Sequence, residues 1–221
     1  MNQVSYQLKP DDYFGHLRRE LVSEVPFNSG VVLEVGCGDG VTGAALKGEG
    51  RAKSVIGIEL FEAAAARASK VLDRVIVGDI EQIDLPFDFG QFDAIILGDV
   101  LEHLIDPWKQ LRRLQSYLSP KGVVIASLPN VRNWRVSLQL LLLGKWDYRD
   151  SGILDKTHLR FFTRDSMIKL FVDSGFSVQK IQPIGKRSLI ISRLLIGLIS
   201  ELAAPQYLIV TTPNNFKGST R

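Results

Sequence analysis

The feature that most constrains the fold is a series of five short apolar segments that alternate with stretches of helical character. The segments are rich in valine and isoleucine and lie at 31–36, 54–60, 74–80, 92–100 and 123–130. Nearly continuous apolar strands of this kind are typical of parallel sheets that helices cover on both faces. Helices are expected in the connections between the strands. The sequence therefore predicts an α/β protein of three layers, with the sheet in the middle.

The segments outside this unit predict further helices. Apolar residues at helical spacing predict an amphipathic helix over 11–25, and a leucine-rich stretch predicts an inserted helix over 132–143. No repeat or linker divides the chain, so residues 1–221 are expected to form one domain. Within it, 131–162 is expected to be an insertion that caps the substrate site.

The C-terminal part departs from simple alternation. Thr163 is expected to cap a helix over 164–174, because threonine is a favoured N-cap residue. Strands are expected at 176–184 and 206–213, joined by a buried helical crossover over 188–204.

Composition excludes several classes of protein. The chain has 27 Lys and Arg against 24 Asp and Glu, and a net charge of +3 is too small to indicate a nucleic-acid partner. Its single cysteine, Cys37, excludes an intrachain disulfide and a CxxC metal pair. The first residues lack the apolar core of a secretory signal, and no apolar run approaches about 20 residues. We expect a cytoplasmic protein without a dedicated metal site.

Carboxylates end three of the predicted strands around a glycine cluster. The cluster, EVGCGDG at 34–40, joins the first strand to its helix, where glycines let the backbone turn tightly and approach a ligand. Glu59 follows Gly40 by 19 residues at the end of the second strand, where a carboxylate can bind ribose hydroxyls. Asp79 ends the third strand, where its carboxylate can accept a hydrogen bond from an adenine amino group. The arrangement predicts a cofactor that contains a nucleoside.

Two cofactor classes fit this arrangement. A nicotinamide dinucleotide site prefers the pattern GxGxxG, whose third glycine is replaced here by Val41. S-adenosylmethionine (SAM) has no phosphate and needs a close loop for its methionyl part, with acceptors for its amino group and ribose. The sequence favours SAM over a dinucleotide oxidoreductase.

At these motifs the chain resembles the small-molecule branch of the class I SAM-dependent methyltransferases. EVGCGDG (34–40), IGIEL (56–60) and VGDI (77–80) resemble the first three motifs of that family. FDAIILGDVLEHL (92–104) resembles the fourth-strand motif, and VVIASLPN (123–130) resembles the fifth strand. The resemblance covers most of the chain. It implies a Rossmann-like α/β/α sandwich with a mostly parallel seven-stranded sheet of order 3-2-1-4-5-7-6, whose last strand is antiparallel.

The resemblance also implies how SAM would be held. Gly36 and Gly38 would approach the methionyl part, and Glu34 would orient the loop or the amino group. Glu59 would bind the ribose, and Asp79 with the backbone amide of the next residue would hold the adenine. The full set of expected cofactor residues is Glu34, Gly36, Cys37, Gly38, Glu59, Leu60, Asp79, Ile80, Gly98 and Asp99. Cys37 is expected to serve as a small residue that fits the loop, not as a nucleophile.

The acceptor side is less determined. A base is needed only when the acceptor is a hydroxyl or a similarly protonated group. The candidate catalytic residues are His103 and His158, and the candidate substrate-binding residues are Asn130, Asp155 and Arg160. His103 could instead fix the loop beside Glu102. The candidates within 155–160 (Asp155, His158 and Arg160) could instead stabilise the loop that contains them. We expect O-methylation of a sugar, a phenol or quinone-like molecule, or a lipid-linked intermediate.

Several alternatives stay open. Segment 131–150 could be a lid over an apolar acceptor, could contact a membrane, or could bury its leucines in the domain or in a dimer partner. The chain could be a monomer or a homodimer. RNA methylation is a weaker alternative, because the [DN]PP[FYW] motif of amino-methylating enzymes is replaced by GDVL at 98–101. A further alternative is a non-catalytic module that binds SAM or a nucleotide.

Overall fold

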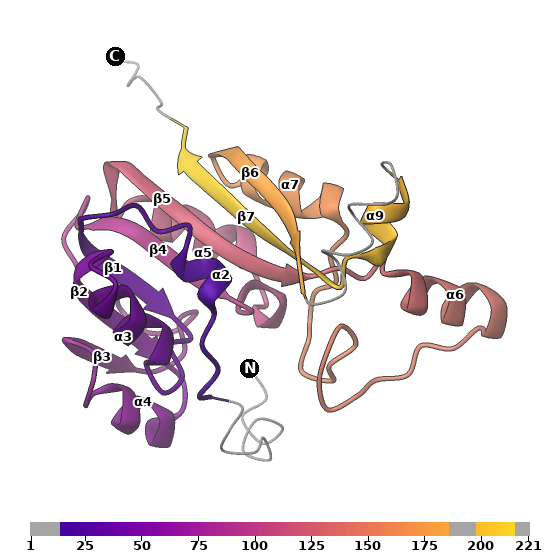
Figure 1. The fold of residues 1–221 in the computed structure, drawn as a ribbon, viewed down its shortest axis with the longest axis horizontal. Helices are drawn as coiled ribbons and strands as arrows, with labels where there is room; N and C mark the ends of the chain where they lie inside the picture. Colours follow the sequence, from indigo (N-terminus) through magenta and orange to yellow (C-terminus); the bar gives the residue numbers. More distant parts are fainter. Residues whose placement is uncertain (1–13, 186–197, 215–221) are drawn as a thin grey trace.

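The computed structural model describes residues 14–185 and 198–214 and contains one seven-stranded sheet (Figure 1). The strands are β1 (Ser29–Val35), β2 (Ala52–Glu59), β3 (Arg74–Val77), β4 (Phe92–Gly98), β5 (Leu118–Pro129), β6 (Phe176–Ile184) and β7 (Gln206–Pro213). Their order is β3-β2-β1-β4-β5-β7-β6, and every pairing is parallel except those of β7 with β5 and β6. The predicted fold class, strand order and antiparallel last strand are confirmed.

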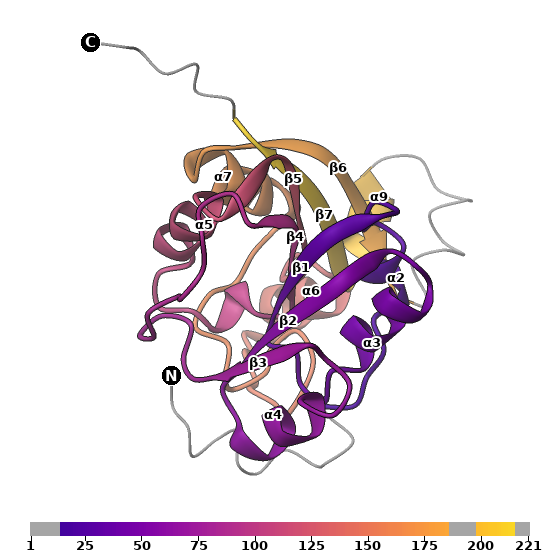
Figure 2. The ribbon, with the colours of Figure 1, turned by 90° about the vertical axis from the view of Figure 1, so that its left-hand side faces the viewer.

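Helices cover both faces of this sheet. They are α2 (Arg19–Val22), α3 (Val41–Gly48), α4 (Glu62–Ala68), α5 (Pro107–Gln115), α6 (Trp134–Leu143), α7 (Arg164–Asp173) and α9 (Leu198–Ala203), with a 3-10 turn, η2 (Leu101–His103). In the edge-on view, α5 and α7 lie on one face, whereas α2 and α3 lie on the other (Figure 2). The sheet is therefore the middle of three layers, with helices on either side (Figure 2).

Alternate side chains of each strand enter two separate cores. In β1, Leu33 and Val35 pack into the core that includes Leu111 of α5, whereas Val32 packs into the core that includes Leu46 of α3. Successive strand residues point to opposite faces, so a strand covered on both faces must be apolar at nearly every position. This is why the central strands are visible in the sequence as continuous apolar runs.

Within its described part, the N-terminal helix predicted over 11–25 is confirmed only over four residues. Residues 14–18 are not helical, and α2 covers only Arg19–Val22. The carbonyl of Phe14 accepts a hydrogen bond from the Asp39 N–H at 3.0 Å, and the Arg18 N–H donates to Thr42 Oγ1 at 3.2 Å. Backbone groups that a helix would pair internally are bound to the glycine loop and to α3 instead.

The start of the fifth strand also differs from expectation. Strand β5 begins at Leu118, not at 123, and its pairing with β4 jumps from Leu118 to Val123. Residues 119–122 therefore form an irregularity inside the strand. Of the predicted helix over 188–204, residues up to 197 lie outside the described part of the chain, and α9 forms its end.

The inserted helix is α6, and it stands away from the rest of the molecule (Figure 1). Asn133 caps its start by accepting from the Arg135 N–H at 3.2 Å, and Gly144 ends it at a φ of 63°. None of its residues is buried, and Leu141 is 79% exposed. The expectation that this helix buries its leucines in the domain is wrong for the part of the chain described. None of the described helices combines the length and apolar composition needed to cross a membrane.

Thr163 caps α7 as predicted. Its Oγ1 accepts from the Ser166 N–H at 3.3 Å, while Ser166 Oγ accepts from the Thr163 N–H at 2.8 Å. This reciprocal capping box satisfies two N–H groups that a helix start leaves unpaired. The helix then buries Met167, Leu170 and Phe171 against the sheet.

We expect Thr163→Ala to lower the free energy of unfolding by about 1 kcal/mol, because it removes the N-cap acceptor. Urea-induced unfolding followed by circular dichroism measures the loss. Thr163→Ser keeps the hydroxyl and is the matched control, with a much smaller loss expected. Equal losses in the two variants would assign the effect to the threonine methyl group and not to the cap.

Candidate active site

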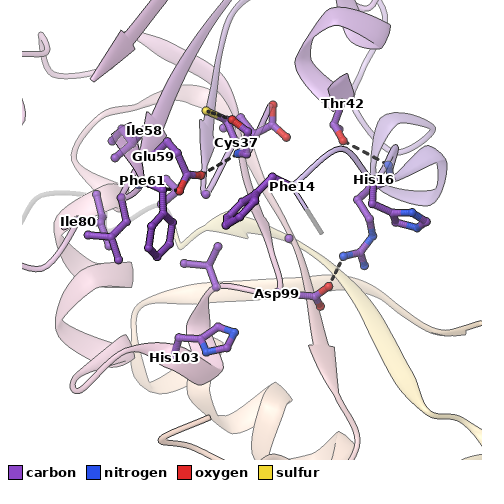
Figure 3. Close-up of a pocket in the computed structure, with 18 of the residues that line it drawn as sticks. Phe14, His16, Cys37, Thr42, Ile58, Glu59, Phe61, Ile80, Asp99 and His103 are labelled. Atoms are coloured by element: carbon purple, nitrogen blue, oxygen red, sulfur yellow. Dashed lines mark hydrogen bonds and ion pairs between the residues drawn. The ribbon is translucent and has the colours of Figure 1, made fainter. Parts of the chain in front are cut away.

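A cavity of about 510 Å³ opens at the carboxyl ends of β1, β2 and β4 (Figure 3). Its volume lies within the range of about 300–1,000 Å³ that is typical of small-molecule and cofactor sites. All the residues expected to bind the cofactor line it, from Glu34 in β1 to Asp99 after β4. Parallel strands bring them together because their carboxyl ends meet at one edge of the sheet. The individual role of each residue stays a prediction.

The loop after β1 approaches its neighbours so closely that glycine is required. Gly36 and Gly38 have φ values of 69° and 54°, a region that side chains rarely adopt. A Cβ on Gly38 would lie 2.5 Å from the Phe14 carbonyl oxygen, and one on Gly36 would lie 2.9 Å from the Val100 side chain. Backbone, not side chain, therefore forms this wall of the cavity.

Glu59 joins the glycine loop to the end of β2. Its Oε2 accepts from the Gly38 N–H at 2.7 Å, and its Oε1 accepts from the Phe61 N–H at 3.1 Å. Burial raises the pKa of Glu59, and the backbone donors lower it in part. A carboxylate has about four acceptor positions, so hydroxyl groups in the cavity can still donate to it.

Glu34 is a buried carboxyl with one unsatisfied oxygen. It lies on the α3 side of the sheet, where the Gly43 N–H donates to it, and its Oε2 has no hydrogen-bond partner among the described residues. Burial raises the pKa of Glu34 to about 8, and the nearby Glu59 adds to this. A buried oxygen without a partner calls for an explanation, and at a cavity wall a ligand donor supplies one.

Cys37 fills the space between the loop and β2. A Cβ on Gly57 would lie only 2.5 Å from its Sγ. Burial raises the pKa of the Cys37 thiol, and the carboxylates of Glu34 and Glu59 raise it further. A thiol that stays protonated is a poor nucleophile, which favours the predicted role of a small residue that fits the loop.

Three residues that the sequence analysis did not assign to the site also line the cavity: Phe14, His16 and Arg18. The ring centroid of Phe14 lies 5.3 Å from that of Phe61, and Arg18 forms an ion pair with Asp99. They lie in segment 11–25, whose apolar residues have helical spacing, and no motif distinguishes them as ligand-facing. The structure brings them to the glycine loop because residues 14–18 are not helical.

Asp99 anchors the network that holds this N-terminal segment. It has a φ of 55°, a conformation that aspartate tolerates better than most residues. Its carboxylate accepts hydrogen bonds from Arg18 and Gln206, and from Ser127 Oγ at 3.1 Å. A non-glycine residue held at positive φ beside a ligand cavity is typical of functional sites.

His103 lies on the wall of the cavity that follows β4 (Figure 3). Its Nδ1 is 3.1 Å from the carbonyl oxygen of Thr157. Since a carbonyl only accepts, the neutral ring carries its proton on Nδ1, and Nε2 is the basic nitrogen. Of the two candidate catalytic histidines, only His103 lines the cavity.

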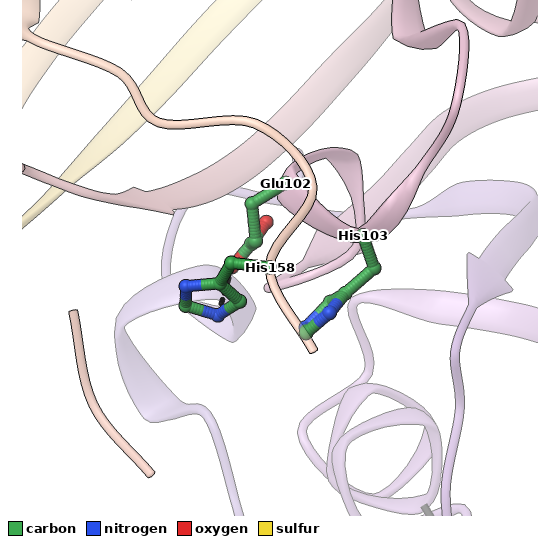
Figure 4. Close-up of side chains that lie close together, drawn as sticks. All are labelled: Glu102, His103 and His158. Carbon is green, nitrogen blue, oxygen red and sulfur yellow. Dashed lines mark ion pairs between the residues drawn. The ribbon is translucent and has the colours of Figure 1, made fainter. Parts of the chain in front are cut away.

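His158 packs edge-on against His103 with ring centroids 4.7 Å apart (Figure 4). Its Nδ1 donates to the Ile153 carbonyl at 3.0 Å, and its Nε2 lies 4.0 Å from Glu102 Oε1. Burial raises the pKa of Glu102 well above its usual range. Ligand-type atoms of Glu102, His103 and His158 all lie within 4.8 Å of one another, close enough to share a metal ion. The absence of a metal site stays a prediction.

The three candidate substrate residues do not line the cavity: Asn130, Asp155 and Arg160. Asn130 donates to the backbone carbonyls of Glu201, in α9, and of Ala204, just after it, at 2.9 Å each. Arg160 donates to the Ile105 carbonyl, and Asp155 accepts from Thr157. These contacts stabilise loops, and the substrate roles of the three residues stay predictions.

The family model described as "Methyltransferase domain" matches residues 11–181. The chain belongs to this methyltransferase family. The ubiquinone biosynthesis O-methyltransferase of Pseudomonas paraeruginosa is 32% identical over 157 residues, which cover 63% of this chain and 64% of that protein. The protein of the same name from Ruegeria pomeroyi is 30% identical over 178 residues, which cover 73% and 65%. The methyltransferase described here thus spans less than two-thirds of the length of either relative.

Solved structures share the fold of this methyltransferase. One is the chain from Haloferax volcanii solved in a complex with the Trm112 methyltransferase activator, with a TM-score of 0.68, 16% identity and coverage of 96% and 94%. Another is a SAM-dependent methyltransferase from Mesorhizobium loti, with a TM-score of 0.61, 18% identity and coverage of 87% and 95%. At these identities the likeness shows the fold alone. With the family match, the expectation of a methyltransferase is confirmed, and SAM stays the expected cofactor.

We expect cofactor affinity to rise with pH through Glu34. Its pKa of about 8 means that the carboxyl is neutral at pH 6, and an ammonium group that pairs with it must first displace its proton. Ionisation costs less as the pH approaches 8, so affinity for SAM should increase by up to about tenfold per pH unit between pH 6 and 8. Calorimetric titration at several pH values measures this.

Glu34→Gln is the control for this experiment, because it keeps the shape and removes the ionisable group. The pH dependence left in the variant belongs to the ligand and to other groups such as Glu59. If the wild-type affinity is as flat with pH as that of the variant, Glu34 does not pair with the ammonium group.

Proposed function

We propose that the protein transfers the methyl group of SAM to a hydroxyl oxygen of a small-molecule acceptor, with His103 as general base. The observation that carries the proposal is the ring of His103 at the cavity wall, with its Nδ1 tied to the Thr157 carbonyl at 3.1 Å. An attacking hydroxyl must lose its proton, and a neutral imidazole nitrogen within hydrogen-bond reach takes it. The two relatives named as O-methyltransferases support this class of reaction.

The residues around the cavity fit SAM. The unpaired buried oxygen of Glu34 suits its amino group, the carboxylate of Glu59 suits its ribose hydroxyls, and Asp79 suits its adenine. The glycine loop presents its backbone to the cavity, because a Cβ on Gly36 or Gly38 would clash with Val100 or Phe14. SAM supplies a methyl group already activated for transfer. The protein itself has to align the acceptor, take up its proton and exclude water.

The wall next to His103 is suited to exclude water. Val100 and Leu104 line the cavity on either side of it in sequence, and Leu104 is almost fully buried. A dry wall strengthens the hydrogen bond between the acceptor hydroxyl and the imidazole, because competing water is absent. The same wall accommodates an apolar portion of an acceptor, as in a phenol.

We expect His103→Gln to lower kcat on the order of 100-fold or more, because glutamine keeps hydrogen-bonding capacity but cannot take up a proton at neutral pH. The affinity for SAM should stay unchanged, since the cofactor residues are untouched. A panel of catechols, hydroxybenzoates, sugars and RNA with labelled SAM identifies the acceptor and then measures the rate.

The matched control is His16→Gln, a histidine of the same cavity on the opposite segment. Its kcat should stay within a few-fold of the wild type. An active His103→Gln enzyme would contradict general-base catalysis by this residue. SAM binding without turnover of any member of the panel would favour the non-catalytic module.

The proposal includes a lipid bilayer as a partner of α6. Leu140, Leu141, Leu142 and Leu143 follow one another, and at about 100° per residue they point to all sides of the helix. They are between 47% and 79% exposed. A flat protein surface could cover only one side of this end of the helix, whereas lipid acyl chains can surround leucines on all of its sides.

The surroundings of this leucine tip (residues 140–143) match a membrane surface. Aromatic and basic side chains lie on both sides of it in sequence: Trp134, Arg135, Lys145, Trp146, Tyr148 and Arg149. Tryptophan and tyrosine are favoured at membrane–water interfaces, and basic residues are attracted to anionic lipid. Of the acidic residues nearby, Asp150 is paired with Lys156 at 2.7 Å, and Asp147 accepts from Gln139 at 2.8 Å.

We expect the protein to sediment with vesicles of phosphatidylglycerol and phosphatidylcholine, and the double variant Leu141→Glu/Leu142→Glu to lose more than about tenfold in affinity. Phe89→Glu is the control, since Phe89 is 81% exposed on a loop remote in sequence and should keep its affinity. Failure of the wild type to bind vesicles would contradict the proposal, as would a homodimer that the double variant dissociates.

A further inference from the structure

Asp155 is a buried carboxylate that faces no part of the cofactor cavity. It is 3% exposed and is not among the residues that line the cavity. Burying a carboxylate is unfavourable unless donors satisfy it. Its Oδ1 accepts two hydrogen bonds from one residue, from the Thr157 N–H at 2.9 Å and from Thr157 Oγ1 at 2.8 Å. This double contact fixes both the backbone and the hydroxyl direction of Thr157.

Thr157 in turn presents both of its oxygens to His103. Its carbonyl oxygen lies 3.1 Å from Nδ1 of the ring, and its Oγ1 lies 3.3 Å from the same atom. A hydroxyl can normally donate or accept, but the proton of this one is directed to Asp155. Toward His103 it can therefore only accept. Both oxygens require a proton on Nδ1.

We propose that Asp155 is a positioning residue for His103, acting through Thr157 to make Nε2 the basic nitrogen. If the Thr157 hydroxyl donated to the ring instead, Nδ1 would lose its proton and Nε2 would carry it. His103 could then not take up a proton from a hydroxyl in the cavity. The inference rests on the proposed function of His103 and assigns a role in it to a residue that contacts neither cofactor nor acceptor.

The backbone around Asp155 keeps this arrangement close to the base. The carbonyl of Glu102, the residue before His103, accepts from the Leu159 N–H at 2.8 Å. The carbonyl of Asp155 accepts from the His158 N–H at 3.0 Å, and the His158 ring packs edge-on against His103 (Figure 4). The carboxylate is thus held by the same segment that packs against the base.

A purely loop-stabilising role for Asp155 would change stability but not the tautomer of His103. The tautomer can be measured without an acceptor. Long-range ¹H–¹⁵N correlation spectra distinguish protonated from unprotonated ring nitrogens, and the protein can be saturated with S-adenosylhomocysteine. The chain contains three histidines, so single His→Gln variants assign the signals.

In the wild type at pH 8 we expect only the Nδ1–H form of His103. Asp155→Ala should give a mixture that contains a measurable fraction of the Nε2–H form, because the Thr157 hydroxyl can then donate to Nδ1 while the Thr157 carbonyl still favours a proton there. Asp155→Asn keeps an oxygen that can accept both bonds from Thr157 and should restore the wild-type tautomer. Asp150→Ala, an acidic residue of the same segment that is exposed, is the control and should leave the tautomer unchanged.

Affinity for S-adenosylhomocysteine, measured by calorimetry, should stay within about twofold of the wild type in these variants. A wild-type tautomer in Asp155→Ala would overturn the proposal. If Asp155→Ala does not fold, Thr157→Val takes its place, because it removes one of the two acceptors at Nδ1. That variant should raise the Nε2–H form to a detectable minor fraction, and an unchanged tautomer there would equally overturn the proposal.

The two proposals fail in different ways. If His103→Gln is fully active while the tautomer depends on Asp155, the proposed function is wrong and the control of the tautomer by Asp155 is confirmed. If His103→Gln is inactive and the tautomer does not depend on Asp155, the positioning role is wrong and the proposed function stands. Where both hold, Asp155→Ala should lower kcat in proportion to the loss of the Nδ1–H form, with the KM for SAM unchanged.

Discussion

The hydrogen bond from the Gly38 N–H to Glu59, at 2.7 Å, joins the loop after β1 to the end of β2. The other oxygen of Glu59 binds the Phe61 N–H, so one carboxylate fixes the start of two connections. Gly38 also has to be glycine because the Phe14 carbonyl lies against it. The N-terminal segment therefore lies over a loop whose position Glu59 sets. Removing that carboxylate would leave the N–H groups of Gly38 and Phe61 without this acceptor and would loosen both connections at the cavity.

This end of the sheet concentrates polar groups that a stable core would avoid. Burial raises the pKa values of Glu34, Glu59 and Glu102, three carboxyls that lie in or near the cavity wall. Each costs free energy in the absence of a partner. The apolar cores on the two faces of the sheet offset this cost, because the central strands bury side chains on both faces. The arrangement is typical of a site in which ligand groups complete the hydrogen bonds that the protein leaves open.

The sequence allowed the sheet and many of the residues that line the cavity to be predicted for one physical reason. Central parallel strands are apolar on both faces, and the ligand-facing residues follow them directly, so both signals are local in sequence. The non-helical segment at Phe14 was missed because its apolar residues have the spacing of a helix. The hydrogen bond from the Asp39 N–H that holds it in place leaves no signal in that spacing. The state of His103 could not be read at all, since it depends on Thr157, 54 residues further along the chain. Residue types identified the acceptor-side candidates but not which of them face the cavity.

The two sides of the site therefore depend on different constraints. The cofactor side is built from strand ends and glycine backbone, and changes there would disturb the sheet itself. Segment 149–160 does not line the cavity but contacts His103 from behind its wall, and its internal hydrogen bonds are largely independent of strand pairing. His103 belongs to both, because its backbone follows β4 while the proton on its ring is set by Thr157. With His103 as the proposed base, a change in segment 149–160 would alter the ring that takes up the proton without moving the strand ends that line the cofactor cavity.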